Sequence, residues 1–188
     1  MTRPPDGFLQ TNFSGQAYDK WFFRGISRHD GVDPYIATQL LGAFVGAVLV
    51  YLAYLPHWKP TTDKTLKLGV FCTAPAIRNI PANCVTEIIG TFVLVFVVIA
   101  IGAKAVGAGG VLGPLMVGLL VWALGVSLGG PTGYAINPAR DLGPRIAHAL
   151  VPIPGKGGSD WAYAWVPVAT PIIGGLLATG TASAVGMI

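Results

Sequence analysis

The sequence predicts an all-α membrane protein, a bundle of four transmembrane helices and one re-entrant half-helix. Hydrophobic residues make up 53% of the 188 residues and charged residues only 11%, whereas soluble domains carry about a quarter charged residues. The mean hydropathy is +0.62. The net charge of +4 comes from scattered basic residues, so we expect no nucleic-acid partner. The lipid bilayer is the expected surrounding.

Residues 1–34 are expected to form a polar leader, and residues 35–188 the membrane domain. The leader is mixed in charge and interrupted by glycines. It has no continuous apolar segment of the kind found in a cleavable signal peptide.

Residues 35–55 form the first apolar run, which is uncharged and long enough to cross a bilayer. Gly42 and Gly46 give this helix a face that another helix can approach closely. Gln39 is its only amide. Two interpretations of Gln39 stay open: a polar residue near the headgroups, or a hydrogen bond that steadies a pore loop. Residues 56–82 follow as a loop that is too polar to span.

Residues 83–103 form the second apolar run, with Glu87 near its start. A carboxylate within a membrane helix is costly and usually faces the bundle interior or a cavity. Glu87 is consistent with a proton relay, which would imply a transporter, and with a structural role as acceptor for backbone N–H groups. No second intramembrane acid or histidine follows at relay spacing, so we favour the structural role.

The third run covers residues 111–128 and ends near a small-residue pair, Gly125 and Gly129. The last run begins with aromatic residues at 161, 163 and 165, typical of the membrane interface. In this run small residues recur every four positions and predict one smooth packing face: Thr170, Gly174, Ala178, Ala182 and Gly186.

Between these two runs lies a short predicted helix. Asn137 suits its N-cap and Pro138 its first position. Prolines at 152 and 154 limit the helix to about residue 150. At 1.5 Å per residue it would be about 20 Å long, too short for a hydrocarbon core of about 30 Å. Non-helical backbone at that depth is tolerated only inside protein or beside water, so the segment predicts a pore.

The run Asn137-Pro138-Ala139-Arg140, entered through residues 132–135, resembles the second NPA box of the aquaporin superfamily, the major intrinsic proteins. The whole run between two apolar spans carries the resemblance, which extends over residues 34–188. It implies a partial aquaporin-like bundle.

Other positions resemble the glycerol-conducting branch, the aquaglyceroporins or glycerol uptake facilitators. They are Asp141, Arg145 and the pair Pro167-Val168. Ala74 departs from this pattern, because glycerol channels often have an aromatic residue in the comparable loop.

The resemblance implies a passive channel for glycerol, other small uncharged solutes and water. Its selectivity filter would use Gly125, Tyr134 and Arg140, with Gly125 leaving room for a solute bulkier than water. The resemblance also implies a multi-pass protein of the plasma membrane that assembles as a homo-oligomer, the family tetramer, and a structural role for Glu87.

The family is built from two inverted repeats, and this chain matches only the last span of the first repeat and all of the second. We therefore expect residues 1–34 to replace most of the first repeat in a truncated or frameshifted product. The alternative hypothesis is a non-conducting subunit that assembles with or inhibits a full-length relative. We expect the chain alone to form no selective pore, because the half-helix would lack a facing partner.

A proton-coupled transporter is the third hypothesis and rests on Glu87 alone. An enzyme is the least favoured, since no nucleophile–base pair is apparent. We expect no cofactor and no metal, because neither Cys72 nor Cys84 has metal-ligand spacing. The histidines are interpreted as interfacial: His29, His57 and His148.

Overall fold

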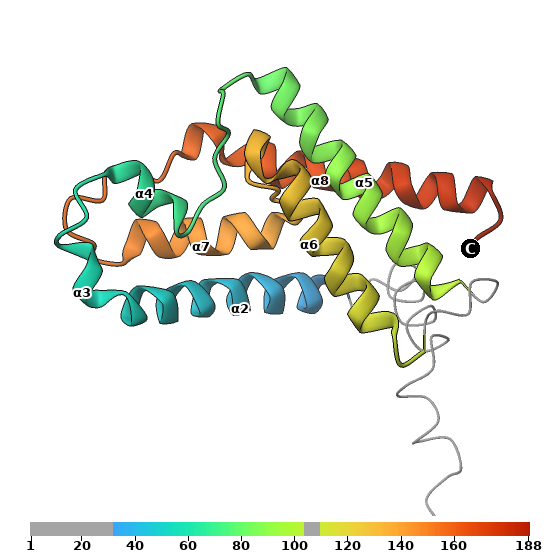
Figure 1. The fold of residues 1–188 in the computed structure, drawn as a ribbon, viewed down its shortest axis with the longest axis horizontal. Coiled ribbons are helices and arrows are strands. Elements are labelled where there is room, and N and C mark those ends of the chain that lie inside the picture. The colour runs from blue at the N-terminus through green and yellow to red at the C-terminus, as the bar shows by residue number, and fades with distance from the viewer. Residues whose placement is uncertain (1–31, 104–109) are drawn as a thin grey trace, which may run out of the picture.

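The computed structural model describes residues 32–103 and 110–188, which form helices and no strands (Figure 1). The helices are α2 (Val32–Ala53), α3 (Leu55–Trp58), α4 (Lys64–Gly69), α5 (Ile80–Gly102), α6 (Gly113–Thr132), α7 (Pro138–Leu150) and α8 (Trp161–Ala184). Four of them, α2, α5, α6 and α8, are long and apolar enough to cross a membrane. The predicted fold class, four spans and a short helix in an all-α bundle, is confirmed.

Several helix boundaries differ from the sequence-based expectation; α5, for example, begins at Ile80 rather than at residue 83. Helix α2 begins at Val32, three residues before the expected start, while the rest of the predicted leader lies outside the described residues. Helix α6 continues past the expected end at residue 128 to Thr132, with Pro131 in its last turn. It ends at Gly133, whose φ of 79° is left-handed and whose N–H donates to the Gly129 carbonyl at 2.9 Å. This is a glycine C-cap, so the turn into the half-helix is shorter than predicted.

Helices α2 and α7 lie side by side along their lengths (Figure 1). Their backbones approach closely at Gly143: a Cβ there would lie 2.8 Å from the Ala43 Cβ and 2.9 Å from the Leu40 carbonyl oxygen. The expected close approach at Gly42 and Gly46 is not found within the described residues, where a Cβ on either would meet nothing within 4 Å. The glycine that brings α2 and α7 together is therefore on α7.

Helices α5 and α8 form the second close pair, and α6 packs against α5 (Figure 1). A Cβ on Gly174 would lie 2.6 Å from the Ile88 carbonyl oxygen. The predicted smooth face of α8 is buried at Thr170, Ala178 and Ala182. Gly186 does not belong to this face, because it lies beyond the helix end with a φ of 73° and open space around it.

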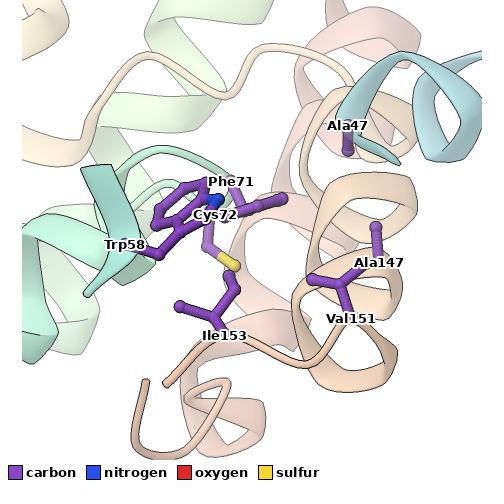
Figure 2. Close-up of a cluster of buried hydrophobic side chains, with 7 residues drawn as sticks. All are labelled: Ala47, Trp58, Phe71, Cys72, Ala147, Val151 and Ile153. Carbon is purple, nitrogen blue, oxygen red and sulfur yellow. The ribbon is translucent and has the colours of Figure 1, made fainter. Parts of the chain in front are cut away.

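A compact apolar cluster closes one end of the α2–α7 pair (Figure 2). Trp58 of α3 and Phe71 stack with ring centroids 5.7 Å apart, and Phe71 tilts against the ring of His148 at 5.4 Å. The other buried members are Ala47, Cys72, Ala147, Val151 and Ile153. The cluster packs the loop between α2 and α5 onto the end of the half-helix.

Replacing Gly174 with alanine should destabilise the bundle, because the new methyl group would overlap backbone atoms of α5. Overpacking of this kind costs about 1–3 kcal/mol. We expect Gly174→Ala to lower the Tm in detergent. Gly180→Ala on the same helix is the matched control, since a Cβ there meets nothing within 4 Å. Equal melting temperatures for the two variants would contradict this account of α5–α8 packing.

Candidate functional site

The start of α7 is capped by Asn137. Its backbone is extended, with φ −159°, and its Oδ1 accepts a hydrogen bond from the Ala139 N–H at 2.9 Å. Pro138 occupies the first helical position, as expected. The Asn137 Nδ2 donates to Gln39 Oε1 of α2 at 3.3 Å. Gln39 is half-buried, and this hydrogen bond to the cap residue of α7 agrees with the second interpretation of its amide, a bond that steadies the loop before the short helix.

Glu87 of α5 holds the turn that precedes α7. Its Oε1 accepts from the Ala135 N–H at 3.0 Å and its Oε2 from the Ile136 N–H at 2.9 Å. Tyr134 and Ile136 have φ values of 41° and 44°, a conformation that costs free energy in residues other than glycine. The Glu87 side chain is 1% exposed. Because both oxygens accept backbone N–H groups, the geometry of Glu87 fits the structural role expected from the sequence.

The three residues expected to form the selectivity filter come together at this turn. We call Gly125, Tyr134 and Arg140 the filter trio. A Cβ on Gly125 would lie 3.2 Å from the Tyr134 ring. The guanidinium carbon of Arg140 lies 5.5 Å from the centroid of the same ring. Arg140 is exposed, and the ion pairs among the described residues do not include it. The trio presents an aromatic face beside a cation whose side-chain donors have no hydrogen-bond partner within residues 32–103 and 110–188.

Asp141 pairs with Arg145, one turn along α7, and both side chains are fully buried. Arg145 Nε donates to Asp141 Oδ1 at 2.7 Å and Nη2 to Oδ2 at 2.8 Å. Nη1 donates to the carbonyls of Ser159 and Asp160 at 2.7 and 3.1 Å, and Nη2 also donates to the Thr73 carbonyl at 3.0 Å. All five guanidinium N–H groups are therefore used.

Thr73, in the loop between α4 and α5, is a site residue that the sequence did not reveal. Its N–H and its hydroxyl both donate to Asp141 Oδ2, at 2.8 and 2.6 Å. The side chain is 3% exposed. No local signal in the sequence marked Thr73, because its partner is 68 residues away.

The far end of α7 is closed by Lys156. Its Nζ donates to the carbonyls of His148, Ala149 and Val151 at 2.6–2.8 Å, which places a cation at the negative end of the helix. His148 was expected at an interface but is fully buried, with Nδ1 2.8 Å from the Ser159 hydroxyl. His57 is exposed, and His29 lies outside the described residues.

Pro167 is buried and Val168 half-buried, both within α8. Ala74 is half-buried beside Thr73. Within residues 32–103 and 110–188, no group of three His, Cys, Asp or Glu side chains could hold a metal ion.

Comparison with known proteins identifies the family of this chain. The family description "Major intrinsic protein" matches residues 20–181. The chain belongs to the major intrinsic protein family. Membership and the four apolar helices make it a multi-pass integral membrane protein.

The chain is similar to members of this family named for glycerol uptake. It is 65% identical over 146 residues to the probable glycerol uptake facilitator protein of Thermotoga maritima, covering 78% of this chain and 62% of the relative. It is 63% identical over 144 residues to the glycerol uptake facilitator protein of Bacillus subtilis, covering 77% and 52%. The chain thus spans between about half and two thirds of the length of these relatives.

A solved structure shares the fold. The aquaglyceroporin from Plasmodium falciparum superposes with a TM-score of 0.65 at 27% sequence identity. The alignment covers 79% of this chain and 61% of the other.

Replacing Glu87 with glutamine should weaken the turn before α7. Each Glu87 oxygen accepts one backbone N–H, from Ala135 or Ile136. Glutamine keeps only one of these acceptors, so its amide N–H₂ would face a backbone N–H that then has no acceptor. An unsatisfied buried donor costs about 1–3 kcal/mol. We expect a lower Tm for Glu87→Gln, with Thr86→Val as the control on the same helix. A variant as stable as the wild type, with loss only of proton-dependent uptake, would instead support the transporter hypothesis.

Proposed function

We propose that this chain forms the wall of a passive channel in the plasma membrane for glycerol, other small uncharged solutes and water. The observation that carries the proposal is the filter trio: the Tyr134 ring lies against Gly125 with the Arg140 guanidinium beside it. A polyol has a hydrocarbon face and a hydroxyl face. Tyr134 would contact the carbons while Arg140 donates hydrogen bonds to the hydroxyls.

Gly125 sets the width in this proposal. It has no side chain, so the Tyr134 ring lies directly against its backbone and the solute would pass beside that ring. Channel selectivity depends on pore diameter and on the donors and acceptors that line it. A glycine here suits a solute broader than water, which agrees with the names of the similar proteins.

The charges of the site favour neutral permeants. The N-terminus of α7 carries the positive end of the helix dipole, and Arg140 adds a fixed positive charge within the first turn. Cations would be repelled there. The Asp141 carboxylate adds little to this field, because its charge is paired with the buried Arg145 guanidinium.

The chain carries no catalytic role in this proposal and needs no cofactor. We also propose a homo-oligomer, as the family resemblance implies, with glycerol and water as permeants and lipid as the surrounding.

Reconstitution into liposomes tests the proposal by stopped-flow light scattering. Vesicles would contain the chain alone, or the chain together with the part of the Thermotoga maritima relative that it does not match. Within the described residues the N-terminus of α7 faces no second half-helix, so we expect no glycerol permeability above empty vesicles for the chain alone and clear permeability for the pair. Folded protein that conducts in neither case would overturn the channel and favour a non-conducting subunit. Flux from the chain alone would mean that copies of this chain complete the pore.

The width of the filter is tested by Gly125→His in the conducting vesicles. An imidazole would meet the Tyr134 ring and fill the space beside it. We expect glycerol flux to fall about tenfold more than water flux, a barrier difference of about 1.4 kcal/mol. Gly118→Ala on the same helix is the control, because nothing lies within 4 Å of a Cβ there. Equal losses of both fluxes in a folded histidine variant would remove Gly125 from the filter.

A further inference from the structure

The loop between α4 and α5 touches the backbone that carries the filter tyrosine. A Cβ on Gly133 would lie 3.2 Å from the Thr73 Cβ and 3.4 Å from its Cα and Cγ2. Three residues on, the Ala76 N–H donates to the Pro131 carbonyl at 3.2 Å. The loop therefore covers the segment immediately before Tyr134.

From these contacts we infer that Thr73 is a positioning residue, which fixes the Tyr134 ring over Gly125 and so sets the size of solute that passes. This inference rests on the proposed channel function. Thr73 need not touch the solute, since it acts through Gly133.

Thr73 is held from the side of α7 by a buried carboxylate. Its hydroxyl donates to Asp141 Oδ2 at 2.6 Å, its N–H donates to the same atom at 2.8 Å, and its carbonyl accepts from Arg145 at 3.0 Å. Hydrogen bonds to ionised partners are shorter and stronger than neutral ones. We call these three bonds the Thr73 clamp.

Tyr134 depends on support from both sides of its position in the chain. On the C-terminal side Glu87 binds the N–H groups of Ala135 and Ile136. On the N-terminal side Gly133 has a left-handed φ of 79°, and Thr73 packs over it. Tyr134 itself has a φ of 41°. Such backbone persists only when its surroundings hold it in place, so a looser Thr73 would let the turn relax and the ring move.

The hydroxyl of Thr73 can be removed with little change in shape. Thr73→Val keeps the methyl group that faces Gly133 and loses one bond of the clamp, whereas Thr73→Ser keeps the hydroxyl. Thr61→Val, in the preceding loop between α3 and α4, is the matched control. Among the described residues, the Thr61 hydroxyl bonds only to the His57 carbonyl, at 2.8 Å.

Cys72 provides a readout that does not depend on conduction. It is adjacent to Thr73, 3% exposed, and burial raises the pKa of its thiol to about 12. Both features make it slow to react with a maleimide. The other described cysteine, Cys84, is half-buried and would be replaced by serine in all variants.

The experiment measures two quantities for each variant in the conducting vesicles: the rate of maleimide labelling at Cys72 and the ratio of flux for a five-carbon polyol to flux for glycerol. For Thr73→Val we expect both to rise about fivefold, the effect expected from the net loss of one hydrogen bond. Thr73→Ser and Thr61→Val should stay near the wild type.

Three outcomes would separate the possibilities. Faster labelling with an unchanged flux ratio would overturn the inference and leave the channel intact. Unchanged labelling and ratio in Thr73→Val would show that the clamp does not hold the loop, which also overturns it. If no vesicle conducts any polyol, the channel proposal fails, and the inference fails with it whatever the labelling rate.

Discussion

The buried ion pair of Asp141 and Arg145 is the constraint on which the arrangement around the half-helix depends. Both side chains are fully buried, and burying charges is costly unless they are paired and their remaining hydrogen bonds are satisfied. Here the arginine uses all five N–H groups, and its backbone partners come from two loops, at Thr73 and at Ser159 and Asp160. Moving either loop would leave donors of a buried cation unsatisfied. One pair on α7 thereby joins three segments that are distant in sequence.

Two buried carboxylates, rather than apolar packing alone, shape the candidate filter. Glu87 binds the two N–H groups after Tyr134, and Asp141 holds the loop that covers the residue before it. The positive φ values at Tyr134 and Ile136 need such support, because left-handed backbone is unfavourable for side chains of their size. Each acid supports the backbone on one side of Tyr134, which explains why a chain with so few charged residues has two acids inside the bundle.

The sequence predicted the helices that are determined by residues within or next to them. Asn137, Pro138 and the prolines after residue 150 are enough to bound α7, and the apolar runs are enough to place the four spans. What it missed depends on distant contacts. Gly42 and Gly143 are indistinguishable as glycines, yet only Gly143 meets another helix in the described residues. Thr73 could not be singled out without knowing that Asp141 lies beside it. The later end of α6 followed from a left-handed Gly133, a conformation that glycine permits but does not require.

The hydrogen-bond partners of the polar side chains near the start of α7 also determine which of these side chains could still bond to a permeant. Glu87 accepts a backbone N–H with each oxygen and is only 1% exposed, which favours its structural role over a proton relay. Asn137 can offer a permeant a donor, because its oxygen caps α7 and, within the described residues, Gln39 accepts one of its two amide hydrogens. Arg140 contributes donors and no acceptor. In the proposed channel, a hydroxyl that passed these residues would accept hydrogen bonds from them, and water molecules held in that orientation would not pass a proton along a chain. Neutral polyols are the solutes that we propose for such a wall.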